Sequence, residues 1–228
     1  MAAITWDEVG KREYETGVDH GVLYPLSTSN AYDTGVAWNG LISISENPSG
    51  AESSPKYADN IKYLDMTSAE EFGCTIEAFT YPPEFELCDG TAELAPGVTI
   101  SQQARQTFGL SYRTKVGNDT EGNEHAYKLH LVYGAKAAPT QKQYQTINDS
   151  PEPITFSWEV TTTPVVVKAI NSKTKKPFAP TAHLTINSAT IDPSKLKAIE
   201  DMLYGTGSGG GPKLPTPDEI LAVLTPGG

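Results

Sequence analysis

Alternation of apolar and polar residues with a period of two recurs along most of this sequence and constrains the fold more than any other feature. Successive side chains of a β-strand point to opposite faces, so an apolar residue at every second position predicts a strand with one buried face. About seven such strands predict a mainly β protein, a sandwich or a barrel. The alternating sets are Val36, Trp38, Ile42 and Ile44; Phe72, Cys74, Ile76 and Ala78; Phe108, Leu110, Tyr112, Thr114 and Val116; Tyr127, Leu129, Leu131 and Tyr133; Ile154, Phe156, Trp158, Val160 and Thr162; Val165 to Ile170; and Leu184, Ile186, Ala189 and Ile191.

Helical signals are fewer. Asp192 is a favourable N-cap, Pro193 fits the first helical position, and Gly205 follows a run with one apolar face. These residues predict a helix from Asp192 to Tyr204 that flanks the β-structure. Prolines, early acidic residues and a final glycine predict a shorter helix of about two turns over 82–90.

The last part of the chain differs in composition from the rest. Residues 205–215 are rich in glycine and predict a flexible linker after a single β-domain over 1–204. Thr216 and Glu219 match a capping box before an apolar run, which predicts a C-terminal helical tail over 216–228. A helix this short is marginal alone, so it either docks on a surface, such as a neighbouring copy, or is a frayed tail.

Long connections are also expected within the β-domain. Between Ile44 and Ile61 two prolines and a glycine interrupt any period, which predicts a long loop over 45–60, and an N-terminal arm is expected over 1–16. Loops of this length are usually functional or ordered by a partner. The glycines and asparagines of 117–124 predict a hairpin tip.

Charge and composition exclude several classes of protein. The 228 residues include 17 basic and 28 acidic ones, for a net charge of −11, which repels phosphates and argues against a nucleic-acid-binding protein. The chain begins without a signal peptide and contains no apolar run of membrane-spanning length, so we expect synthesis in the cytoplasm and no membrane partner. Cys74 and Cys88 are expected to be small buried side chains rather than a disulfide.

No arrangement of residues typical of catalysis is present. His20, His125, His130 and His183 have no ligand spacing in the sequence, and the acidic run 119–124 lacks the spacing of an EF-hand, so a solvated hairpin tip is expected there. Nucleophile, phosphate-loop and dinucleotide motifs are also missing. We therefore expect a protein that is not an enzyme, with no catalytic residue, cofactor or metal site.

Several segments between about residue 14 and residue 167 carry a resemblance to a known family. They are GVDHGVLYP (17–25), GVAWNGL (35–41), YADNIKYL (57–64), SAEEFG onward through Tyr81 and Pro82 (68–82), GVTI (97–100), GNDTEGN (117–123), HLVYGA (130–135) and the run 148–164. In these segments the chain resembles the major tail protein, the tail tube subunit, of the long non-contractile-tailed phages (siphophages) of Gram-positive bacteria.

The resemblance implies a β-sandwich or barrel of the tail tube type and a structural protein of the virion tail. Six copies would form a ring, and stacked rings would form a tube around a tape-measure protein and later around ejected DNA, bounded by tail tip and tail terminator proteins. The family contributes no catalytic residues. Two alternatives remain: the same tube in a tail-derived bacterial device, and a carbohydrate-binding or decoration β-sandwich module on a virion or cell surface.

Strand alternation predicts which side chains would line the channel. Small, polar and acidic residues lie opposite the apolar positions of two strands, and an acidic lumen would repel phosphates within about 8 Å of its wall. The alternative is ordinary solvent exposure on the outer wall. The lumen-facing candidates are Glu71, Thr75, Glu77, Ser157 and Glu159.

Contacts between rings are expected from the long loop, the N-terminal arm, the C-terminal helix and a basic turn. The lysines of that turn would attract acidic surfaces of another copy, unless the turn is simply solvated. The inter-ring candidates are Glu46, Asn47, Glu52, Lys56, Tyr57, Lys173, Lys175 and Lys176.

Overall fold

The protein is mainly β, with 44% of its residues in strands and 12% in helices, which confirms the predicted fold class. The first two residues of the expected N-terminal arm and the last three of the expected C-terminal tail lie outside the described residues. The computed structural model describes residues 3–147, 149–171, 173–207 and 209–225.

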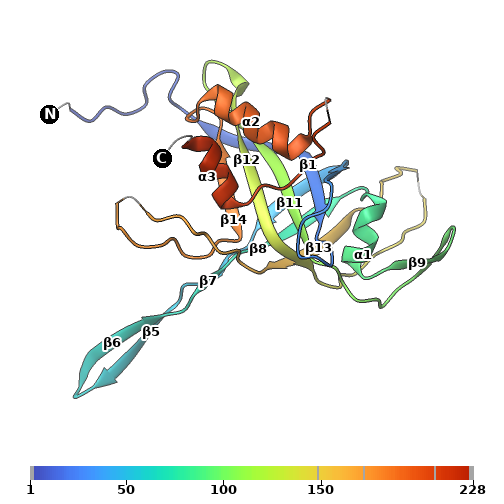
Figure 1. Cartoon of the computed structure of the whole chain (residues 1–228), viewed down its shortest axis with the longest axis horizontal. Helices are drawn as coiled ribbons and strands as arrows, with labels where there is room; N and C mark the ends of the chain where they lie inside the picture. Colours follow the sequence, from blue (N-terminus) through green and yellow to red (C-terminus); the bar gives the residue numbers. More distant parts are fainter. Residues whose placement is uncertain (1–2, 148, 172, 208, 226–228) are drawn as a thin grey trace.

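Eight of the described strands form one antiparallel sheet (Figure 1). Only Asn39 and Gly40 separate β2 from β3, and these two strands lie at opposite ends of the strand order, where β2 pairs with β1 and β3 pairs with β8. One interrupted strand therefore joins both ends of the sheet and closes it as a small barrel. In sheet order the strands are β2 (Val36–Trp38), β1 (Tyr14–Pro25), β11 (Phe108–Asn118), β12 (Gly122–Ala137), β13 (Phe156–Thr162), β8 (Gly73–Ala78) and β3 (Leu41–Glu46), with β14 (His183–Asn187) also paired to β12.

Strand β12 changes partner along its length. Residues 128–132 pair with β14, whereas residues 135–137 pair with β13. Gly134 lies between these two stretches with a φ of +59°, a conformation that glycine adopts without steric cost. The barrel is therefore splayed at this point, with β13 and β14 diverging from the same side of β12.

Aromatic side chains form the centre of the barrel interior. Trp38, Phe85 and Trp158 are almost fully buried, and the Phe85 ring centroid lies 4.5 Å from that of Trp38 and 5.1 Å from that of Trp158. Phe85 comes from a short helical segment, a 3₁₀ turn over Pro83–Phe85 followed by α1 (Glu86–Asp89), which confirms the helix predicted over 82–90.

The two cysteines are buried and form no disulfide, as the sequence predicted. Burial raises the pKa of each thiol to about 12, so both remain protonated at neutral pH.

A second core lies between the outer face of the sheet and two helices, α2 (Pro193–Tyr204) and α3 (Pro217–Leu224). Both helices lie over β1, β12 and β14 in Figure 1. Ile220 of α3 is 3% exposed, and the Tyr133 hydroxyl donates a hydrogen bond to the Pro215 carbonyl at 2.9 Å. The C-terminal helix thus docks on its own chain and is not a frayed tail.

The capping residues are those that the sequence predicted. The Asp192 side chain accepts hydrogen bonds from two amides of the first turn of α2, and Thr216 and Glu219 form a reciprocal capping box on α3. The end of the linker is packed rather than extended, because Leu214 is 1% exposed in the outer core and the Lys213 amide donates to the Met202 carbonyl at 2.7 Å.

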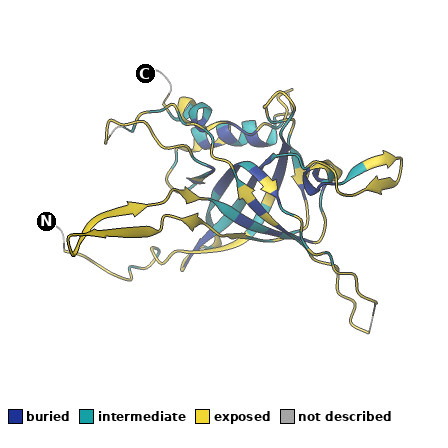
Figure 2. Cartoon of the chain, turned by 90° about the horizontal axis from the view of Figure 1, so that it is seen from below, coloured by how far each residue is buried: buried dark blue, intermediate teal, exposed yellow. Residues whose placement is uncertain are grey.

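Two hairpins leave the barrel and expose most of their residues, shown in yellow in Figure 2. The first has two ladders, β4 (Ser49–Gly50) with β7 (Glu70–Glu71) at its base and β5 (Ser53–Ala58) with β6 (Ile61–Thr67) beyond it, and the second pairs β9 (Ala92–Ala95) with β10 (Val98–Ile100). The long loop predicted over 45–60 is wrong over most of its length, because 45–46 end β3, 49–50 form β4 and 53–58 form β5. Both faces of β5 are exposed, so no burial imposes the alternation by which a strand is recognised.

Two further boundaries differ from the prediction. The strand expected from Val165 to Ile170 is absent, and the segment forms only isolated bridges from Val165 to Thr181 and from Ile170 to Pro177. Its partner stretch contains Pro177 and Pro180, which have no amide hydrogen to donate to a ladder. The N-terminal arm is also shorter than predicted, because β1 begins at Tyr14.

Candidate functional site

The outward face of β8 and β13 gathers four of the five lumen-facing candidates. Thr75 lies opposite Glu159 and Glu77 opposite Ser157 in the antiparallel register. The Ser43 hydroxyl donates a hydrogen bond to the Glu77 carboxylate at 2.8 Å from the neighbouring strand β3. These side chains therefore form one polar surface with two carboxylates, which we call the acidic face.

The fifth candidate, Glu71, is exposed on β7 beside this surface. It lines a shallow hollow together with Thr75, Glu159 and Asn47. The Asn47 side-chain amide donates a hydrogen bond to the Thr75 hydroxyl at 3.0 Å. All five candidates are thus neighbours on one side of the barrel, and Asn47 belongs to this surface.

The hairpin of β5 and β6 extends away from the barrel (Figure 1). It carries three of the inter-ring candidates, Glu52, Lys56 and Tyr57, at or within its first strand. Its exposed apolar side chains are Tyr57 (71% exposed), Ile61, Tyr63, Leu64 and Met66. A monomeric surface does not normally gather large apolar side chains in this way, so this hairpin has the composition of a contact surface.

Other projecting segments expose apolar side chains too. Leu94 and Val98 lie on the β9–β10 hairpin, Tyr144 and Ile147 lie on the connection between β12 and β13, and Trp6 of the N-terminal arm is 77% exposed. The basic turn is also exposed. Its inter-ring candidates are Lys173, Lys175 and Lys176.

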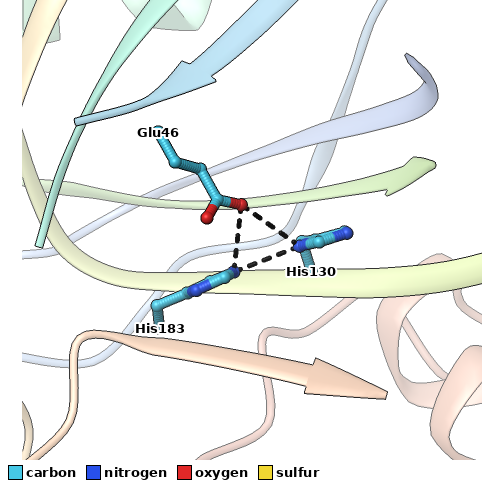
Figure 3. Close-up of side chains that lie close together, drawn as sticks. All are labelled: Glu46, His130 and His183. Atoms are coloured by element: carbon cyan, nitrogen blue, oxygen red, sulfur yellow. Dashed lines mark hydrogen bonds and ion pairs between the residues drawn. The ribbon is translucent and has the colours of Figure 1, made fainter. Parts of the chain in front are cut away.

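The eighth inter-ring candidate, Glu46, points elsewhere. It ends β3, and Figure 3 shows its carboxylate directed toward the imidazoles of His130 on β12 and His183 on β14. The closest nitrogens of the two histidines are 3.2 Å apart, and they lie 3.5 Å and 3.8 Å from the Glu46 carboxylate. His130 is buried, whereas the Glu46 side chain is 40% exposed. We call these three residues the histidine–glutamate cluster.

Neighbouring side chains fix the orientation of His130. Its ring stacks on Tyr112 with a centroid separation of 4.6 Å, and the Tyr112 hydroxyl donates a hydrogen bond to Glu46 at 2.9 Å. The Thr114 hydroxyl donates to Glu15 at 2.6 Å, so its oxygen is left to accept from His130 Nε2 at 3.0 Å. This arrangement places the proton of neutral His130 on Nε2 and leaves the Nδ1 lone pair facing the cluster.

Burial sets the charge of the cluster. It lowers the pKa of His130 to about 4, an effect to which the adjacent His183 adds, and it also lowers the pKa of His183. Burial and the Glu46 carboxylate together raise the pKa of Tyr112. Two neutral imidazoles therefore face one carboxylate at neutral pH.

This cluster was not predicted, because the two histidines are isolated in the sequence. His130 and His183 are far apart in the chain, and the pairing of β12 with β14 brings them together. In both expected strands the histidine lies on the face opposite the alternating apolar residues, so the sequence pattern gave no signal for the cluster. Among the described residues, this is the one group of three potential metal ligands.

Comparison with models of known protein families gives no match for the chain, and comparison with curated proteins gives none either. No described helix has both the length and the apolar character needed to cross a membrane.

Proposed function

We propose that this chain is a structural subunit that assembles with copies of itself into stacked rings, forming the tube of a phage tail. The sequence resemblance in the segments between residues 14 and 167 suggests this function. The stacked hexameric tube, the virion location and the tape-measure, tip and terminator partners are all parts of the same proposal.

The observation that carries the proposal is the contrast between a complete core and apolar projections. The barrel and its helices bury most of their apolar residues, whereas Tyr57, Tyr63 and Met66 on the β5–β6 hairpin are more than half exposed. Covering such side chains contributes roughly 25 cal/mol per Å² of apolar surface, and neighbouring copies of the chain would cover them in a tube. Contacts between copies in a tube would also account for the exposed apolar side chains on the other projecting segments, such as Leu94 on the β9–β10 hairpin and Tyr144 on the β12–β13 connection.

The acidic face would line the channel. Glu77 and Glu159 carry charges of the same sign as DNA, so they would keep the passing DNA from adhering to the wall. The alternative location of this face, on the outer wall, would serve solubility alone.

Electron microscopy of particles that contain the chain tests the proposed function. We expect a hollow tube of stacked rings with six-fold symmetry. If the chain is instead located in a peripheral spike or an isolated decoration, with no tube built from it, the proposal is wrong.

A charge reversal tests the channel face separately. The double variant Glu77→Lys with Glu159→Lys should assemble and then release DNA more slowly, because the wall would attract phosphates. The matched control is Asp201→Lys, which reverses an exposed carboxylate on α2. If DNA release from the double variant equals that of the control, the acidic face does not line the channel, although the tube proposal stands.

The carbohydrate-binding alternative has less support. Sugar recognition by stacking needs exposed aromatic rings gathered in one site, whereas the exposed Trp6, Tyr57 and Tyr144 lie on three different projecting segments. Trp38 and Trp158 are 2% and 0% exposed. Binding of the purified chain to a glycan array would favour this alternative over the tube.

A further inference from the structure

The histidine–glutamate cluster lies where three strands meet. Glu46 is the last residue of β3, His130 lies in the part of β12 that pairs with β14, and His183 is the first residue of β14. The barrel is splayed here, because β12 has not yet begun to pair with β13. In the described sheet β3 and β14 are not paired, and the side chains of Glu46 and His183 meet across the space between them.

The spacing of the three facing atoms is that of metal ligands. A tetrahedral zinc ion with bonds of about 2.0–2.1 Å holds its nitrogen and oxygen ligands roughly 3.3 Å apart. The cluster atoms are separated by 3.2, 3.5 and 3.8 Å. An ion can therefore bind with only small movements of the side chains.

The surroundings of the cluster also suit a metal. The Nδ1 lone pair of His130 faces inward because its Nε2–H is directed to Thr114, which is in turn hydrogen-bonded to Glu15. Metal-bound histidines almost always make such a second hydrogen bond, which orients the ring and makes it more basic. His183 is held by stacking on Phe72 with a centroid separation of 4.5 Å.

We propose that Glu46, His130 and His183 bind one zinc ion, with water in the fourth position. Two imidazoles and one carboxylate are a common zinc donor set with an open position, whereas Ca²⁺ and Mg²⁺ prefer oxygen ligands alone. Because the Glu46 side chain is 40% exposed, an ion can reach the site from solvent.

The position of the site in the chain gives it a structural role. Glu46 directly precedes the segment 47–71, which forms the projecting β5–β6 hairpin and its β4–β7 base, and Phe72, which stacks on His183, directly follows it. The Asn47 amide donates to the Gly73 carbonyl at 2.7 Å and closes the base of this segment. Zinc would thus fasten both ends of the projecting segment to β12 and β14. The zinc proposal does not depend on the tail-tube function.

Zinc titration of the full-length chain tests the site. After removal of metal with a chelator and dialysis, we expect added ZnCl₂ to bind at one ion per chain by calorimetry. Zinc at about 100 times its dissociation constant should raise the melting temperature by about 5 °C. It should also slow hydrogen exchange at the Asn47 amide. Co²⁺ in place of zinc should show the strong visible absorption of tetrahedral coordination.

Three variants locate the ligands. Glu46→Gln keeps the size of the side chain and an acceptor for Tyr112, while His183→Gln changes a residue near the surface; both should fold, and each should weaken zinc binding by about 100-fold or more. His125→Gln is the control, since His125 also contacts carboxylates but lies outside the cluster. It should bind zinc like the original chain.

Two results would overturn the proposal. One is a folded original chain that binds no zinc and whose melting temperature does not change, which would leave the cluster as a hydrogen-bond network alone. The other is equal zinc affinity in the original chain, Glu46→Gln and His183→Gln, which would place the ion elsewhere.

Discussion

Gly134 lies where β12 exchanges one partner strand for another, and no other residue type fits there. Its φ is +59°, and a Cβ atom added to it would lie 2.2 Å from the Thr163 carbonyl oxygen, which belongs to the backbone and cannot rotate away. We expect Gly134→Ala to lower the free energy of unfolding by more than the 1–2 kcal/mol or so that left-handed backbone alone costs. Urea denaturation measures the change.

Gly122 provides the matched control. Its φ is +61°, but an added Cβ would have no atom within 4 Å. Gly122→Ala should therefore show only the cost of the left-handed backbone. If both substitutions lower the free energy of unfolding equally, the clash between the added Cβ and the Thr163 carbonyl costs nothing.

Asp89 anchors a buried ionic group. Its carboxylate lies 2.6 Å from the Lys142 ammonium and accepts a hydrogen bond from the Trp158 indole at 3.1 Å, and Arg105 lies 3.6 Å away. Burial lowers the pKa of Lys142, but the hydrogen bond to Asp89 and its charge raise it by more, so the net shift is upward. The side chain of Asp89 is 6% exposed.

Removing this carboxylate should be costly. We expect Asp89→Ala to reduce the free energy of unfolding by about 3 kcal/mol, because it leaves two cations and an indole N–H without their common acceptor. Asp89→Asn, which keeps the acceptor for Trp158, should lose less. Chemical denaturation of both variants measures this order, and a loss below about 1 kcal/mol for Asp89→Ala would contradict it.

The burial of a single residue could be predicted where the residues next to it in the sequence determine which face of a strand it occupies. Trp38 and Trp158 follow strand alternation, which predicted their burial, and both are in the barrel core. The histidine–glutamate cluster depends instead on which strands pair and on where β12 changes partner. Neither is encoded locally, so the cluster could not be predicted.

The β5–β6 hairpin can be tested as a separate element. All of its strand residues are exposed, so it contributes no core. We expect replacement of residues 51–69 by Asn-Gly, which joins Gly50 to Glu70 through a two-residue turn, to leave the melting temperature within a few degrees of the original while abolishing self-assembly. Circular dichroism measures the first and sedimentation velocity the second.

This replacement keeps Glu46 and the β4–β7 pairing, so the shortened chain should still bind zinc. A loss of self-assembly could then not be attributed to loss of the zinc site. The natural comparison is a replacement of the β9–β10 tip, Pro96–Gly97, by the same two residues. If the chain without the β5–β6 hairpin still assembles normally, this hairpin is not a contact surface.

Elements were predictable where side chains mark their ends or where one face is buried. The caps Asp192 and Thr216 located the first residues of α2 and α3 to within a residue. The long β1 strand was not predicted at all, since its register with β11 shifts twice and breaks the alternation. The exposed strands β5 and β6 gave no signal because burial does not act on them.

At the scale of the whole molecule, charge and apolar contact oppose each other in assembly. A net charge of −11 makes copies of the chain repel, whereas the exposed apolar side chains of the β5–β6 hairpin favour contact. The basic turn with Lys173, Lys175 and Lys176 is too small to reverse the overall sign. Salt acts on the two contributions differently, because it screens charge and leaves apolar contact intact.

Self-association should therefore strengthen as salt rises. Between about 0.1 M and about 1 M NaCl the Debye length falls from about 10 Å to about 3 Å, which removes most of the repulsion between copies. Light scattering and sedimentation velocity should show larger assemblies at the higher concentration. The chain with residues 51–69 replaced is the control for unspecific salting-out and should remain monomeric throughout. If association weakens with salt instead, attraction between the lysine turn and acidic surfaces governs assembly, and the apolar hairpin does not.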